Sequence, residues 1–86
     1  MKDIETVEGQ ENDFYYEVDE NKLGIILKKE TKEEHILFEV LGPKIIQFKN
    51  GIRIKEDEKI QINHRKMDKE IEGFLFNNGY QIEYLN

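Results

Sequence analysis

The chain has 86 residues, which is enough for one small domain with a single hydrophobic core. It has no cysteine and no serine, which excludes disulfide bonds, thiolate metal ligands and acyl transfer by a cysteine or serine nucleophile. The formal net charge of -6 resides in residues 1–22, which hold eight acidic residues and two lysines, while the rest of the chain is neutral.

The first thirteen residues are polar and acidic, and Ile4 and Val7 are their only sizeable apolar side chains after Met1. Such a segment buries too little apolar surface to offset the entropy lost on ordering. We therefore expect a flexible acidic arm over residues 1–13 and a single small domain over residues 14–86. No apolar run approaches the length that crosses a membrane, and the N-terminal region lacks an apolar signal segment, so we expect a cytoplasmic protein.

From Phe14 onward, apolar residues alternate with polar ones in short runs that are separated by turn residues. This period of two is typical of strands with one buried face. The alternating runs cover residues 14–18, 23–27, 36–40, 46–48, 52–54 and 60–62. We expect a mostly β member of the α+β class, in which an antiparallel meander of about six short strands forms a bent sheet or a partly open barrel.

The register of the first hairpins follows from the need to collect apolar side chains on one face. A loop over residues 19–22 pairs Tyr16 with Ile25. A loop over residues 30–33 then pairs Ile25 with Phe38. Both choices place apolar side chains opposite one another.

Asn50-Gly51 lies between two alternating runs and is the strongest local signal for a hairpin. A two-residue loop would set polar residues opposite isoleucines. A three-residue loop that begins at Lys49 pairs Phe48 with Ile52 and uses Gly51 as a left-handed bulge residue. We therefore predict a hairpin at residues 49–51.

The next apolar residues lie at helical spacing, namely Met67, Ile71, Phe74 and Leu75. Asn63 and Asp68 are the candidate N-caps, and Gly79 is the expected left-handed residue after the helix. Gly73 inside the helix predicts a close approach to the sheet. Alternation returns in residues 80–84, which predicts a final strand after a C-terminal helix packed on the sheet.

The face of the sheet that points away from this helix carries an apolar row. The predicted pairings align Tyr15 with Ile26, and Ile26 with Leu37, across three adjacent strands. A contiguous apolar strip on the solvent side of a sheet is typical of a binding surface. The alternatives are contact with a second copy of the chain, cover by the arm through Ile4 and Val7, and scattered exposed residues without a role.

Other residue patterns point to no chemical site. His35 and His64 are the only histidines, and neither has partners at metal-ligand spacing. The glycines are isolated, no carboxylate pair stands out as a general acid and base, and the basic stretch at residues 63–69 is typical of an exposed helix start. We expect no catalytic residue, metal or cofactor, and no direct binding of nucleic acid by this neutral domain.

Our leading hypothesis is a non-enzymatic protein-interaction module. One form is a small inhibitor that occludes a basic, nucleic-acid-binding protein, of the kind that a mobile element or phage encodes. The expected partner-binding residues are Tyr15, Ile26, Leu37, Asp3, Glu5, Glu8, Glu11 and Asp13. The alternative is a homodimeric accessory protein that uses the face of Tyr15, Ile26 and Leu37, and a small carboxylate enzyme is the least favoured. We expect no membrane partner.

Overall fold

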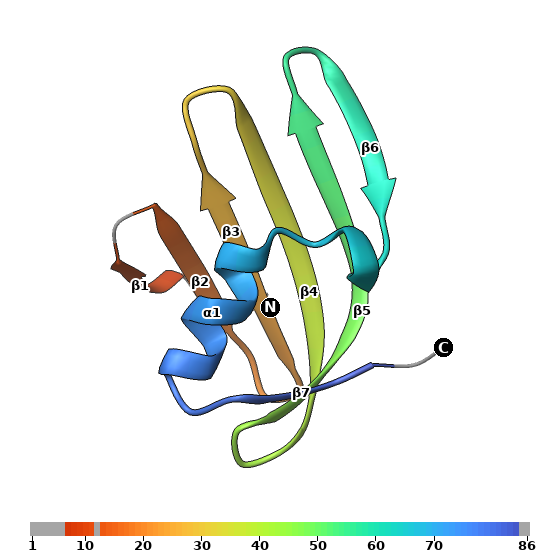
Figure 1. Cartoon of the computed structure of the whole chain (residues 1–86). Helices are drawn as coiled ribbons and strands as arrows, with labels where there is room; N and C mark the ends of the chain where they lie inside the picture. The colour runs from red at the N-terminus through yellow and green to blue at the C-terminus, as the bar shows by residue number, and fades with distance from the viewer. Residues whose placement is uncertain (1–6, 12, 85–86) are drawn as a thin grey trace, which may run out of the picture.

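The computed structural model describes residues 7–11 and 13–84 (Figure 1). Six strands follow one another in an antiparallel meander: β1 (Val7–Glu11), β2 (Phe14–Val18), β3 (Lys22–Lys28), β4 (Lys32–Gly42), β5 (Ile45–Lys55) and β6 (Glu58–Ile62). The sheet is open and does not close into a barrel. The expected mostly β architecture, with one helix near the C-terminus and a final strand, is confirmed.

Three further elements complete the described chain, namely a short 3-10 helix η1 (His64–Lys66), the helix α1 (Lys69–Asn77) and the strand β7 (Gln81–Glu83). Figure 1 shows α1 across one face of the sheet. β7 pairs in parallel with the beginning of β5, whereas β6 pairs with the end of β5. The last strand therefore extends the same edge of β5 that β6 occupies.

The core lies between the sheet and α1. Its buried apolar side chains are Leu23, Ile25, Leu27, Ile36, Phe38, Ile46, Ile62, Met67, Ile71 and Leu75. Phe74 of α1 stacks on Phe14 of β2 with ring centroids 4.5 Å apart. Burial of one large apolar side chain contributes about 1.5–3 kcal/mol. This shared apolar surface therefore fixes the helix against the sheet.

The helix ends follow the predicted capping residues. The Asp68 carboxylate caps α1 by accepting a backbone N–H of the first turn at 2.8 Å, and the Asn63 side chain caps η1 in the same way at 3.0 Å. Gly79 follows α1 with a φ of 86°, as predicted. The expectation for Gly73 is wrong, because no atom of the sheet lies within 4 Å of the position that a Cβ would take.

The predicted register holds between β2 and β3 but not between β3 and β4. Tyr16 pairs with Ile25, as expected, whereas Ile25 pairs with Ile36 and not with Phe38. The connection is a tight turn, closed by a 2.8 Å hydrogen bond from the Lys29 N–H to the Lys32 carbonyl. Because side chains alternate with a period of two, this two-residue shift keeps every side chain on its expected face.

The predicted hairpin at residues 49–51 is wrong, because these residues lie inside the single long strand β5. The turn between β4 and β5 instead contains Pro43 and Lys44, whose φ is 61°. A bulge at Lys49 adds one residue to β5, since Phe38 pairs with Phe48 while Leu37 already pairs with Asn50. The extra residue changes which side chains of β5 face the core.

β1 was not expected, because the sequence places residues 7–11 in the acidic arm. The structure pairs β1 with β2 in antiparallel register, with an irregularity between Val7 and Gly9. β1 therefore covers the edge that β2 would otherwise expose. Residues 1–6 and 12 lie outside the described residues, so the flexibility of the arm as a whole and the division at residue 13 stay predictions.

Candidate functional site

The sheet has a second face, which points away from α1 in Figure 1 and which we call the outer face. In β3, Leu23, Ile25 and Leu27 are buried against the helix, so the residues between them point outward. The same alternation in β4 places His35 and Leu37 on the outer face. Neither η1 nor α1 lies on this face.

An apolar band crosses the outer face. It consists of Tyr15, Ile26, Leu37, Ile52 and Ile54. Backbone pairing places Tyr15 beside Ile26, and His35 lies between Ile26 and Ile52. Ile52 is 40% exposed, and the other four side chains are half-buried. The band therefore spans four adjacent strands and presents a contiguous apolar surface.

The predicted row needs one correction. Leu37 does not lie directly opposite Ile26, because the β3–β4 register places His35 there and pairs Leu37 with Gly24. Leu37 is thus a diagonal neighbour of Ile26 on the same face, a separation that long side chains bridge. Tyr15 and Ile26 are directly paired, as predicted. The structure brings all three predicted apolar residues together, with His35 among them.

Ile52 and Ile54 were missed as members of the outer face. The predicted hairpin would have turned both toward the core. In the structure the bulge at Lys49 reverses the alternation of β5, so Gly51 and Arg53 face the helix side and the two isoleucines face outward. The outer face is therefore more apolar than the sequence indicated.

Charged residues border the apolar band at both ends of the strands. In the backbone register, Lys28 lies opposite Glu33 at one end and Lys22 lies opposite Glu39 at the other. Glu33 also contacts the His35 ring at 3.0 Å. An apolar centre with a polar rim is the usual anatomy of a protein–protein interface.

The acidic residues expected to bind a partner fall in three places. Asp3 and Glu5 lie outside the described residues, and Glu8 and Glu11 belong to β1 at the edge of the sheet. Asp13 lies 3.8 Å from Lys29, which also pairs with α1 through Glu70 at 2.8 Å. Asp13 therefore lies toward the helix side of the sheet and not within the outer face.

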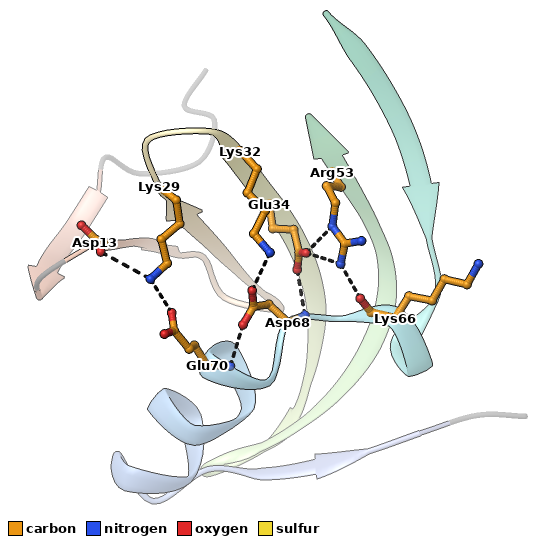
Figure 2. A network of polar contacts seen from close by, with 8 residues as sticks. All are labelled: Asp13, Lys29, Lys32, Glu34, Arg53, Lys66, Asp68 and Glu70. Carbon is orange, nitrogen blue, oxygen red and sulfur yellow. Dashed lines mark hydrogen bonds and ion pairs between the residues drawn. The ribbon is translucent and has the colours of Figure 1, made fainter. Parts of the chain in front are cut away.

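A polar network on the helix side includes a buried carboxylate, Glu34 (Figure 2). Glu34 accepts hydrogen bonds from Arg53 Nε at 2.6 Å and from the Asp68 N–H at 2.9 Å. Arg53 Nη2 contacts the same carboxylate and donates to the Lys66 carbonyl at 2.6 Å. Glu34 has no solvent exposure, and its hydrogen bonds hold η1 and the start of α1 against β4 and β5.

The pKa values of two groups in this network are shifted. Burial alone would raise the pKa of Asp68, but hydrogen bonds from Lys32 at 2.8 Å and from the Glu70 N–H outweigh burial and lower it. A hydrogen bond with Glu70 raises the pKa of Lys29. Both shifts favour the charged forms, so these groups act as ion pairs that connect the sheet with α1.

The remaining candidates for chemistry have packing contacts. His64 stacks on Tyr84 with ring centroids 4.6 Å apart. Burial and then the hydrogen bond to Glu72 raise the pKa of Tyr84. Within residues 7–11 and 13–84, no three or more histidine, aspartate or glutamate side chains cluster closely enough to hold a metal ion. The same residues include no helix that is long and apolar enough to cross a membrane.

Comparison with known proteins yields no assignment: no family model, curated protein or solved structure matches the chain.

Proposed function

We propose that this chain is a non-enzymatic protein-binding module whose outer face packs against another protein chain. The observation that carries the proposal is the apolar band, which crosses four strands on the face opposite α1. Removal of such a band from water is favourable in proportion to the apolar area that is buried. A partner that covers it gains this energy without any change in the fold.

The rim of the outer face supports the proposal further. Lys22, Glu39, Lys28 and Glu33 place both signs of charge around the apolar centre. Mixed charges at a rim select partners and orient them, because like charges that meet across an interface are unfavourable. The face therefore combines an apolar centre, which supplies affinity, with charges that supply specificity.

Occlusion of a basic, nucleic-acid-binding protein is a second form of this proposal. The observation that favours it is the position of β1 at the edge of the sheet, which brings Glu8 and Glu11 next to β2. Acidic residues on one edge would attract a basic partner and would speed its association. In this form the partner contacts the edge as well as the apolar band.

Site-specific cross-linking tests the proposed function. A photo-reactive amino acid in place of Leu37 lies within the apolar band, whereas the same amino acid in place of Asp57 lies in the exposed turn between β5 and β6. In cells that make this protein, we expect protein adducts at position 37 and none at position 57. An absence of adducts at position 37 would contradict a protein-binding role for the outer face.

The occlusion form needs its own measurement. For any foreign protein recovered at position 37, we expect deletion of residues 2–13 to weaken binding and added salt to weaken it as well. The matched control is binding of the same protein by the full chain at low salt. If neither the deletion nor added salt changes the affinity for that protein, the hypothesis that this chain occludes a basic protein is refuted.

A further inference from the structure

We infer that the partner of the outer face is a second copy of this chain, related by a twofold axis that runs along the strands midway between β3 and β4. The inference rests on the proposed function, because it names the occupant of the outer face. The axis passes through the middle of the meander, whose order is β1-β2-β3-β4-β5-β6. Rotation about it stacks β3 on β4 of the second copy, β2 on β5, and β1 on β6.

Such a dimer is a two-layer β sandwich. Two twisted sheets pack face to face at about 10 Å with their strands roughly aligned. A twofold axis along the strands keeps each residue at its own level, so each outward-facing residue of β3 meets the β4 residue with which it is paired in the backbone register of its own chain. The β3–β4 pairings can therefore be read directly as contacts between the copies.

The charged residues of the outer face are complementary to those of a second copy of the same face. Lys22 lies opposite Glu39 in the backbone register of the chain, so Lys22 of one copy faces Glu39 of the other, whose carboxylate also lies 3.3 Å from Lys49 Nζ of its own chain. Lys28 faces Glu33 of the second copy for the same reason. The axis makes each contact twice, which gives four lysine–glutamate pairs around the apolar centre. Opposite charges across a rim favour this orientation over those that join like charges.

The shapes at the centre also fit. Gly24 pairs with Leu37, so the leucine of one copy meets the glycine of the other. A Cβ on Gly24 would approach only the Glu17 carboxylate, in ordinary contact at 3.9 Å, so the glycine leaves room for a side chain beside that carboxylate. Tyr15 meets Ile52 of the second copy, since β2 lies on β5 and both residues belong to the same level. Leu37 thus fills the gap that Gly24 leaves.

A twofold axis that lies in the plane of the interface but runs perpendicular to the strands is less favourable. An axis perpendicular to the strands, passing through the level of Ile26 and His35, places His35 on His35 of the second copy. It also places the Glu33 carboxylate, whose side-chain contact is the His35 ring, against the apolar Leu37 and not against a lysine of the second copy. The axis along the strands avoids both contacts, and this difference selects it.

Charge reversal tests the inference in a way that distinguishes contacts between copies from contacts within one chain. Purified wild-type protein is expected to have the molar mass of a dimer by size exclusion with light scattering. In a dimer of Lys22→Glu, the new glutamate of each copy faces Glu39 of the other. In a dimer of Glu39→Lys, the new lysine of each copy faces Lys22 of the other, so both variants place like charges together. Each variant is expected to raise the dimer dissociation constant at least about tenfold.

An equimolar mixture of the two variants supplies the decisive result. In the mixed dimer, each glutamate at position 22 or 39 faces a lysine of the other chain, so dimers are expected to return. A contact within one chain would not be restored by mixing. Lys69→Glu on α1, where the side chain is 84% exposed, is the control and is expected to leave the dimer unchanged. Circular dichroism checks that all variants are folded.

Two results would overturn the inference, and each bears differently on the proposed function. A monomeric wild-type protein that still cross-links a foreign protein at position 37 refutes the second copy and leaves the protein-binding face intact. A monomer without any adduct at position 37 refutes both. A wild-type dimer whose two variants dimerise as well as wild type refutes this axis, because the lysine–glutamate contacts are then absent.

Discussion

Within residues 13–84, Glu34 is the one charged side chain that is fully buried. Its position opposite Arg53 on the neighbouring strand allows the guanidinium to satisfy the carboxylate, while the Asp68 N–H satisfies its other oxygen. The pair is asymmetric, because the Arg53 side chain keeps 26% of its exposure and Glu34 keeps none. The loss of Arg53 and the loss of the Glu34 charge should therefore lower stability by different amounts.

Removal of Arg53 is predicted to cost more stability than neutralisation of Glu34. Arg53→Ala leaves a carboxylate buried without its counter-ion, which costs about 3–5 kcal/mol. Glu34→Gln leaves a guanidinium that reaches water, so the free energy of unfolding should fall by less. Urea denaturation measures both, with the exposed Arg65→Ala as the control. A larger loss in Glu34→Gln than in Arg53→Ala would contradict this account.

Asp68 connects stability to acid pH. Its pKa is lowered in the folded chain, so the ionised carboxylate stabilises the fold above the ordinary aspartate pKa of about 4, and this contribution is lost as the pH falls through the folded pKa. Asp68→Asn keeps an oxygen that caps α1 but removes the ion pair with Lys32. We expect a loss of about 1 kcal/mol at pH 7.

The pH dependence of this loss is the sharper measurement. The difference in unfolding free energy between wild type and Asp68→Asn should shrink as the pH falls below about 4, since wild-type Asp68 is then neutral as well. Asp57→Asn, in the exposed turn after β5, is the control for the loss of a surface carboxylate. A difference that stays constant from pH 7 to pH 3 would show that the charge of Asp68 has no part in stability.

At the scale of the element, β5 shows why local sequence signals were insufficient. The Asn50-Gly51 pair is a strong hairpin signal, yet the chain continues through it as a strand. A Cβ on Gly51 would lie 2.6 Å from Ile36 Cδ1 and 3.0 Å from Ile62 Cγ1. The glycine is therefore required by packing between three strands, which no local pattern reveals.

Two alanine substitutions separate packing from conformation. Gly51→Ala should lower the free energy of unfolding by about 1–3 kcal/mol, because the methyl group overlaps Ile36. Gly73→Ala, in the middle of α1 with no atom of the sheet nearby, should raise it by about 0.5–1 kcal/mol. Thermal or urea unfolding compares the two variants.

A substitution at Ile36 tests whether its contact with the new methyl group causes the loss of stability in Gly51→Ala. Ile36→Val removes the Cδ1 atom that the new methyl group would meet, so Gly51→Ala should cost less in that background than in wild type. Equal costs in both backgrounds would mean that the contact with Ile36 does not set the requirement, and would point to the contact with Ile62.

At the scale of the whole molecule, much of the fold was predictable because periodicity, caps and turns agree with one another. The alternation in residues 14–18 and 23–27, the cap at Asp68 and the residue after the helix at Gly79 were all confirmed. What failed depended on distant contacts. The bulge at Lys49 reverses the faces of β5, and the ion pair of Glu34 places a carboxylate in a core position.

The same reasons limited the prediction of the candidate site. Tyr15, Ile26 and Leu37 were placed on the correct face because a register error of two residues preserves the face of each side chain. Ile52 and Ile54 were placed on the wrong face, because one added residue in β5 reverses the face to which the following side chains point. The extent of an exposed apolar surface therefore depends on bulges, which sequence patterns identify poorly.

The proposed sandwich makes a further prediction about the stability of the whole molecule. If two copies share the apolar band, unfolding separates them, and stability must rise with protein concentration. Each tenfold increase in concentration should add about 1.4 kcal/mol per mole of dimer at the midpoint of a single unfolding transition. Urea midpoints measured across a hundredfold range of concentration would reveal this shift, which a monomer cannot show.

Leu37→Lys supplies the matched control for that series. The ammonium group at the centre of the apolar band would face Gly24 of the second copy and would lose water on association, so the variant is expected to be monomeric. Its side chain lies on the outer face, away from the core, so the fold itself should persist. The urea midpoint of the variant should then be independent of concentration. A wild-type midpoint that is equally independent would show that burial of the outer face contributes nothing to the stability of this protein.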